Sequence, residues 1–293
     1  MTTISASMVK ELRERTGLGM MECKNALLKA EGDMELAIED LRKASGIKAA
    51  KKSSRVAAEG IVMTKIAEDG NYGVVVEVNS ETDFVARDNN FLDFAKAVLE
   101  QAYANRDADV SQLLEGGLED QRQALVQKIG ENINVRRVER LSFDDANKGI
   151  VESYVHSNNR IAVLIALHGG DETLARDISM HIAALSPMVV RAEDVPETVL
   201  AKESEIYSAQ ARESGKPEEI IEKMIAGRVS KFLKESSLVD QPFVKDPDVT
   251  VGKLVKAAGA EVISFVRYEV GEGIEVEEVD FAAEVAAQVK GAS

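Results

Sequence analysis

The chain has 293 residues, of which 45% are apolar and 30% charged, and its formal net charge is −15. The apolar fraction argues against a disordered acidic chain, and the acidic excess argues against broad binding to a nucleic-acid backbone, which needs Lys and Arg gathered on one face. A single cysteine, Cys23, and three histidines argue against a disulfide framework and against a Cys-rich or His-rich metal centre.

The first 55 residues predict three short helices. Their apolar residues recur at helical spacing, as with Met21, Ala26, Leu27 and Ala30 in the second helix. Residues 48–55, with four basic side chains and no acidic one, are interpreted as a linker. The expected start and stop signals are Ser5 or Ser7 and Thr16-Gly17 for the first helix, Met20 and Gly32 for the second, and Asp33 and Gly46 for the third.

An internal duplication occupies much of the remaining chain. At an offset of 89 residues, Gly60-Ile-Val matches Gly149-Ile-Val, and Ala86-Arg-Asp matches Ala175-Arg-Asp. Each copy has the pattern of a strand, a turn, a second strand and then a helix entered through an acidic turn. The sequence therefore predicts two copies of one α+β unit.

The second copy contains an insertion. Further along the chain, Leu125-Val126 resembles Leu254-Val255 at an offset of 129, so this copy is 40 residues longer than the first. Residues 196–236 are charged, favour helix and are broken at Ser214-Gly-Lys-Pro. Two antiparallel helices of ~17 residues each would project ~25 Å from the core without disturbing it. After the core, 269–284 is acidic, and the segment from Phe281 predicts a C-terminal helix.

No catalytic motif appears in the sequence: it has no phosphate loop, dinucleotide fingerprint, nucleophile elbow, His-Glu-x-x-His or Cys-x-x-Cys. Cys23, within a predicted helix, is interpreted as a small core residue. The sequence also has no secretory signal and no apolar run long enough to cross a bilayer, so we expect a cytoplasmic protein.

Residues 79–89, between a strand and a helix, are the strongest candidate for a functional site. Asp83 could simply cap the helix. Phe84 is a large apolar residue in a turn, where the offset of 89 places Thr173 in the second copy, and in a chain with 4% aromatics this favours a partner contact. An enzymatic interpretation would pair Asp83 or Asp88 with His156 as acid and base.

The turn at Ile129 and Gly130 is a second candidate. Gly130 is typical of the left-handed residue that ends a helix, and its repetition at Gly259 favours that structural role. The turn could also present Ile129 outward.

Five segments resemble those of the bacterial elongation factor Ts family, the guanine-nucleotide exchange factors of elongation factor Tu. They are residues 9–27, 82–85 (Thr-Asp-Phe-Val), 128–137, 180–183 and 241–244. The resemblance covers essentially the whole chain and departs from the usual pattern at Ser80, where the family often has Cys. It implies an α+β fold with four parts: a three-helix module similar to ubiquitin-associated domains with its basic linker (1–55), a core subdomain (56–148), a second core subdomain with antiparallel sheet and a coiled-coil insertion at about 196–236 (149–273), and a C-terminal helical module (274–293).

The resemblance also implies that the protein is an exchange factor and not an enzyme. It would bind elongation factor Tu with GDP and promote GDP release by disturbing the partner's Mg²⁺ and phosphate site, so that GTP can rebind. Thr82, Asp83, Phe84 and Val85 would form the motif that dislocates Mg²⁺ from the partner. Further partner-binding residues would be Ile129, Gly130 and His156 beside Phe84, Leu12 and Lys24 in the N-terminal module, and Val244, which lies near that module in the family.

The resemblance implies no metal, cofactor, nucleic acid or membrane, and the family includes dimers of the one-to-one complex. Two other classes of function stay open. An adaptor that binds ubiquitin-like folds would explain the three N-terminal helices but not the duplicated core. A metal-independent hydrolase would need a deep pocket around Asp83 and His156.

Overall fold

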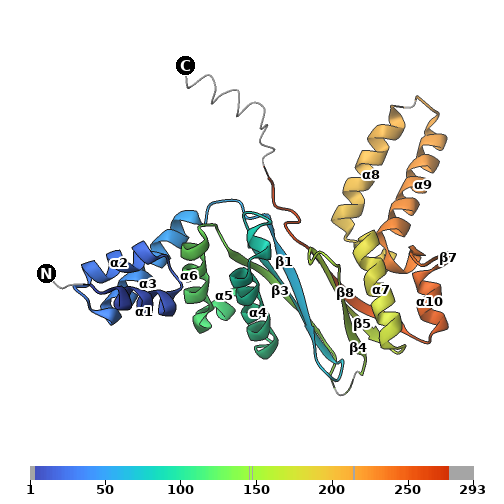
Figure 1. The fold of residues 1–293 in the computed structure, drawn as a ribbon. Helices are drawn as coiled ribbons and strands as arrows, with labels where there is room; N and C mark the ends of the chain where they lie inside the picture. Colours follow the sequence, from blue (N-terminus) through green and yellow to red (C-terminus); the bar gives the residue numbers. More distant parts are fainter. Residues whose placement is uncertain (1–3, 145, 147, 214, 277–293) are drawn as a thin grey trace.

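The computed structural model describes residues 4–276 except 145, 147 and 214 (Figure 1). The predicted helix after Phe281 lies outside the described residues. The elements, where η marks short 3₁₀ or π turns, are α1 (Ala6–Thr16), α2 (Met20–Lys29), α3 (Met34–Lys52), β1 (Glu59–Ile66), β2 (Tyr72–Ser80), η1 (Val85–Arg87), α4 (Asn89–Ala104), α5 (Val110–Leu113), η2 (Leu114–Leu118), α6 (Glu119–Ile129), β3 (Asn134–Ser142), β4 (Ile150–Val155), β5 (Ile161–His168), α7 (Glu172–Leu185), η3 (Ala192–Asp194), α8 (Glu197–Arg212), α9 (Glu218–Ser236), η4 (Leu238–Asp240), β6 (Pro242–Phe243), β7 (Asp246–Thr250), α10 (Val251–Ala257) and β8 (Glu261–Glu269).

The three N-terminal helices form as their caps predict. Ser5 accepts a hydrogen bond from the Met8 amide, Asp33 accepts one from the Leu36 amide, and Gly17 ends α1 in the left-handed conformation. The expected stop at Gly46 is wrong, because α3 continues to Lys52 and includes most of the predicted linker. A Cβ at Gly46 would lie 3.0 Å from the Gln123 side chain of α6, so this glycine lets the two helices pack closely.

The predicted duplication is confirmed by the sheet topology. The two sheets have the orders β1-β2-β3 and β4-β5-β8, and every pairing is antiparallel. The register between the central and third strands shifts at the same place in each sheet, after Glu77 in one copy and after Ala166 in the other, 89 residues later. The extra residue of each β-bulge lies in the third strand, Arg136 in β3 and Ile263 in β8. Each copy is thus one twisted three-stranded sheet with a helix packed on it, and the fold class is α+β as expected.

The Ala-Arg-Asp match, in contrast, is wrong as a structural equivalence. Asp88 caps α4, whereas the residue that caps α7 is Asp171, 83 residues later, and Ala175 lies inside α7. Because the strands are related by 89 residues and the caps by 83, the first copy has six additional residues between its second strand and its helix. Thr173 is therefore not the counterpart of Phe84, which lies in a segment that the second copy lacks.

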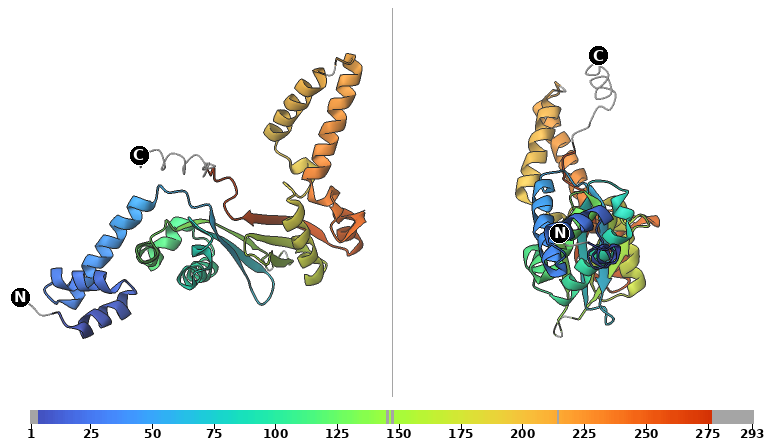
Figure 2. Two further views of the ribbon diagram at one scale, coloured as in Figure 1. Left: turned by 45° about the horizontal axis from the view of Figure 1, so that its top comes forward. Right: turned by 60° about the vertical axis from the view of Figure 1, so that its left-hand side comes forward.

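The predicted insertion is a helical hairpin, but it is longer than expected. Between the helix cap and the helix-ending glycine (Asp88 to Gly130, Asp171 to Gly259) the second copy has 46 additional residues, and the six-residue extension of the first copy reduces the net difference to 40. Helices α8 and α9 pack against each other and project away from the sheets (Figures 1 and 2). Ala211 and Ile221 are buried, and Arg228 donates to the Gln210 side chain across the hairpin at 2.6 Å. Among the described residues, no helix has both the length and the apolar character needed to cross a membrane.

The two copies are joined by an apolar layer and by one buried carboxylate. The layer between the sheets is formed by Val62, Val75, Ala162, Leu164, Tyr268 and Val270. At its edge, the fully buried Glu77 of β2 accepts hydrogen bonds from Arg136, Arg137, Asn79 and the Gly271 amide that follows β8. Burial is the largest influence and opposes ionisation, but these bonds together outweigh it and lower the pKa of Glu77.

Replacement of Glu77 by Gln should therefore lower the free energy of unfolding at pH 7 by about 2–3 kcal/mol, because two arginines lose their charged partner. Since the folded-state pKa lies below the usual 4.5, the stabilisation is complete above that pH and is lost as pH falls through the lowered value. The difference in the free energy of unfolding between the wild type and Glu77→Gln, measured in urea, should thus become smaller below pH 4.5. Glu139→Gln, at an exposed position on β3, is the matched control, and equal effects of the two variants would contradict this account.

Candidate functional site

The six-residue extension lies in the loop between β2 and α4, residues 81–87. Phe84 is 81% exposed, more than any other large apolar side chain among the described residues. Val85, next to it, is only 9% exposed and packs into the core of the first copy. The loop therefore holds an aromatic ring in solvent while its neighbour fixes the backbone beneath it. Val85 is an anchor of this loop and presents little surface to a partner.

Asp83 does not cap the helix. The cap is Asp88, which accepts hydrogen bonds from the side chain and amide of Asn90 and from the amide of Phe91, and these bonds lower the pKa of Asp88. Asp83 instead forms an ion pair of 2.9 Å with Arg87, one turn further on, and its side chain stays half-exposed. The acidic group is thus available at the surface beside Phe84.

The turn between α6 and β3 is hydrogen-bonded to the start of this loop. Gly130 ends α6 with φ of 90°, as its sequence predicts, and Ile129 is half-buried against the core instead of pointing freely outward. The next residue, Glu131, accepts hydrogen bonds from the amides of Glu81 and Thr82 and from the Thr82 hydroxyl, at 2.7 to 3.1 Å. The carboxylate of Glu81 in turn accepts a hydrogen bond from the Asn132 amide. The sequence did not indicate that either glutamate, Glu81 or Glu131, joins the loop to this turn.

The second copy contributes the turn between β4 and β5. Its residues 157–160 line an open hollow of about 500 Å³ together with Asp83 and Arg87. The preceding residue, His156, is exposed, and its Nδ1 lies 3.1 Å from the Tyr154 hydroxyl. Asp83 is paired with Arg87 and His156 with Tyr154, and the two line different hollows, so the geometry gives no support to an acid–base pair. No group of three or more His, Cys, Asp or Glu in the described ranges is placed to hold a metal ion.

Val244 lies in the hairpin formed by β6 and β7. It is 41% exposed and lines a second hollow, of about 580 Å³, together with His156. The expectation that it lies near the N-terminal module is wrong, because β7 and helices α1–α3 are at opposite ends of the molecule (Figures 1 and 2). The hairpin is attached through the buried His181, whose Nδ1 accepts from the Val244 amide at 3.1 Å and whose Nε2 lies 2.9 Å from the Gln241 side-chain oxygen.

In the N-terminal module, the structure separates two residues that the sequence grouped together. Lys24 is exposed on α2, whereas Leu12 is fully buried in the module's core and is not a surface residue. The apolar surface beside Lys24 belongs instead to Met20 and Met21, 60% and 65% exposed. Met21 recurs at helical spacing with Ala26 and Leu27, but it lies on the exposed side of the helix. The signal missed was that Cys23, Ala26 and Leu27 alone complete the buried face of the helix.

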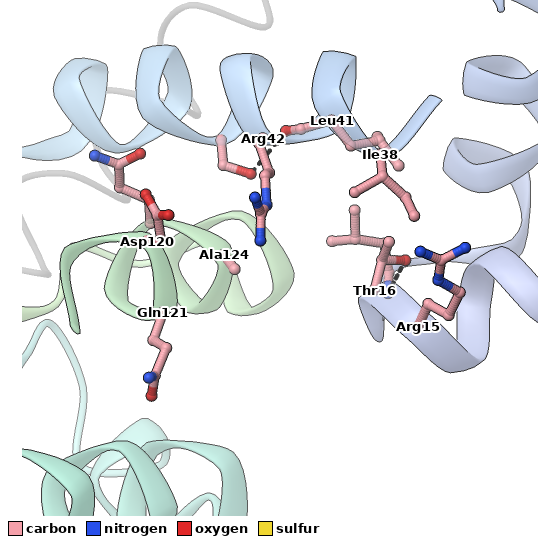
Figure 3. A pocket seen from close by; sticks show the side chains of 11 residues that line it. Arg15, Thr16, Ile38, Leu41, Arg42, Asp120, Gln121 and Ala124 are labelled. Carbon is pink, nitrogen blue, oxygen red and sulfur yellow. Dashed lines mark hydrogen bonds between the residues drawn. The ribbon is translucent and has the colours of Figure 1, made fainter. Parts of the chain in front are cut away.

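The module is held against α6 by polar contacts. The side chains of Ser45 and Gln127 are hydrogen-bonded, and Glu22 accepts from both Gln127 and Lys48 at 2.6 and 2.5 Å. Burial raises the pKa of Glu22, but these two donors outweigh it and the net shift is downward. Beside these contacts lies a hollow of about 250 Å³, into which Arg42 reaches from α3 (Figure 3). It is smaller than most small-molecule sites, which occupy roughly 300–1,000 Å³.

Comparison with known proteins decides the family. The family model described as Elongation factor TS matches residues 81–272. The proteins named elongation factor Ts from Hahella chejuensis, Saccharophagus degradans and Pseudomonas aeruginosa are 67%, 64% and 55% identical to this chain; the alignments cover 99%, 98% and 99% of it and 100%, 98% and 98% of the relatives. The chain belongs to the elongation factor Ts family. It is thus a translation elongation factor by family, and the resemblance seen in its sequence is confirmed.

The buried imidazole of His181 should make the stability of this elongation factor Ts family member depend on pH. Burial lowers the pKa of His181 below its usual 6.5, and the hydrogen bond to Gln241 opposes this shift only in part. The unfolded chain therefore binds the proton more readily, so stability is complete above pH 6.5 and is lost as pH falls toward the folded value. His181→Gln should lower the melting temperature at pH 7.5 but reduce its dependence on pH between 7.5 and 5.5.

The matched control is His156→Gln, because His156 is exposed and should keep the wild-type dependence on pH. Melting curves followed by circular dichroism at several pH values provide the measurement. Equal slopes for His181→Gln and the wild type would show that another group is responsible.

Proposed function

We propose that this chain binds elongation factor Tu in its GDP form and promotes GDP release by disturbing the Mg²⁺ and phosphate site. The chain belongs to the elongation factor Ts family, and membership of this family implies such an exchange activity. A translation factor acts where ribosomes translate, so we also propose the cytoplasm as its location.

The observation that supports this proposal most is the presentation of Phe84. Burying a Phe side chain gains about 1.5–3 kcal/mol, and this chain leaves the ring almost wholly in water on a loop anchored by Val85. Aromatic residues that a partner buries in a pocket are typical binding hot spots. Phe84 is therefore proposed to insert between structural elements of the partner, with Asp83 beside it at the nucleotide site.

Exchange of this kind needs no covalent chemistry. A factor that binds the nucleotide-free partner more tightly must weaken nucleotide binding by the same coupling factor, and nucleotide must in turn weaken the factor's binding. Insertion of Phe84 would stabilise the arrangement of the partner in which Mg²⁺ is poorly coordinated. Rebinding of GTP would then expel the factor.

Two other exposed surfaces are proposed to hold the partner while Phe84 acts. One is Lys24 with Met20 and Met21 on α2. The other contains His156 and Val244, which line one hollow although they are far apart in sequence. Helix α2 and strand β7 lie toward opposite ends of the molecule, and a partner that contacts both surfaces would span the part between them (Figure 1). We propose a one-to-one complex as the exchanging unit.

The test is the release of a fluorescent GDP analogue from elongation factor Tu, followed at increasing concentrations of the factor. Removal of both side chains in Asp83→Ala with Phe84→Ala should lower the stimulated release rate at least ~10-fold, as expected when a hot spot is truncated. The far-ultraviolet circular dichroism and the melting temperature should stay close to the wild type, because the Phe84 side chain is exposed and that of Asp83 is half-exposed. Met188→Ala removes another exposed apolar side chain, between α7 and η3 of the second copy, and should leave the rate unchanged. Full stimulation by the double variant would refute the proposal.

A further inference from the structure

We propose that Glu131 is a positioning residue for Phe84: its carboxylate fixes the first residues of loop 81–87 and thereby sets where the exposed ring stands. This inference rests on the proposed exchange function. It adds a residue from the α6–β3 turn, which lies far from the loop in the sequence but contacts it in the structure. Three features of the molecule support it: the hydrogen bonding of the loop, a reciprocal contact and a difference between the two copies.

The carboxylate of Glu131 accepts three hydrogen bonds from the start of the loop. Its Oε2 accepts from the Glu81 and Thr82 amides at 3.1 and 3.0 Å, and its Oε1 accepts from the Thr82 hydroxyl at 2.7 Å. These amides follow the end of β2 at Ser80, so the ladder of the sheet no longer supplies them with partners. A charged acceptor replaces the missing strand, and hydrogen bonds to a charged group are stronger than neutral ones.

The contact is reciprocal. The carboxylate of Glu81 accepts from the Asn132 amide at 2.6 Å, so each segment's carboxylate binds the other segment's backbone. The same junction includes the end of α3, because Lys52 donates to the Gly130 carbonyl oxygen and Asn132 donates to the Arg55 carbonyl oxygen at 2.8 Å. The first residues of the loop are thus fixed to the α6–β3 turn, and that turn is fixed to the N-terminal module.

The second copy provides an internal comparison. There the helix-ending glycine is Gly259, and the residue after it is Ala260, where the first copy has Gly130 followed by Glu131. That copy lacks the six-residue extension, and its short connection packs directly on the turn, since a Cβ at Gly170 would lie 3.1 Å from the Ala260 side chain. The carboxylate is present where the extended loop is present and absent where it is absent. The pairing indicates that Glu131 supports the extension and is not needed for the fold of the repeat.

A double-mutant cycle between Glu131 and Phe84 tests this role. Glu131→Gln keeps the shape but loses at least one acceptor, and it should lower the maximal rate of GDP release by ~10-fold. The concentration of factor for half-maximal release should change little, because most of the binding surface is elsewhere. With Phe84 already replaced by Ala, the same substitution should have almost no further effect, since the side chain that it positions is gone.

Hydrogen exchange gives a second readout. The amides of Glu81 and Thr82 should exchange faster in Glu131→Gln, while the melting temperature should stay close to that of Glu68→Gln. Glu68 is exposed in the turn at the opposite end of β2 and is the matched charge control. If Glu131→Gln does not fold, Glu81→Gln tests the reciprocal half of the junction in the same cycle.

Each outcome decides the question. Wild-type release rates in Glu131→Gln, or an equal loss with and without Phe84, would overturn the positioning role while leaving the proposed function intact. No effect of Phe84→Ala by itself would instead refute the proposed function. A loss that depends on the presence of Phe84 supports the assignment.

Discussion

The buried carboxylate of Glu77 helps to fix how the two copies are arranged, and the candidate site depends on that arrangement. An apolar layer alone could pack in several registers, because hydrophobic contacts have little directionality. Glu77 adds direction, since it accepts hydrogen bonds from two arginines of β3 and from the backbone after β8. With the sheets fixed, the turn at 157–160 of the second copy meets the first copy beside loop 81–87, where Arg160 pairs with Glu59.

The duplicated scaffold and the functional features occupy different parts of the chain. The strands, the bulges and the helix-ending glycines recur in both copies, so they reflect the requirements of the fold. The differences are a six-residue extension with its Glu131 support in the first copy and a helical hairpin in the second. Phe84 lies in the extension that the second copy lacks, so the fold of the repeat does not require it. The asymmetry between the copies therefore identifies the candidate site more directly than any single motif.

Features that depend on neighbouring residues could be predicted from the sequence. The caps at Ser5 and Asp33, the hairpin insertion and the duplicated strands follow from local patterns and were found as expected. The errors concern contacts between distant segments. Gly46 has the pattern of a helix stop, but α6 packs against it, and Val244 could not be placed without the tertiary fold. A chance Ala-Arg-Asp repeat concealed the extension, because an ungapped comparison cannot detect six inserted residues.

The central claim is that Phe84 inserts at the nucleotide site of elongation factor Tu. A photoreactive phenylalanine analogue at position 84, followed by mass spectrometry of the cross-linked peptides, tests this contact most directly. The account predicts cross-links to the nucleotide-binding domain of the partner that become weaker when excess GDP and Mg²⁺ are added, because nucleotide and factor oppose each other's binding. Cross-links to another domain, or cross-links that GDP and Mg²⁺ do not change, would contradict it.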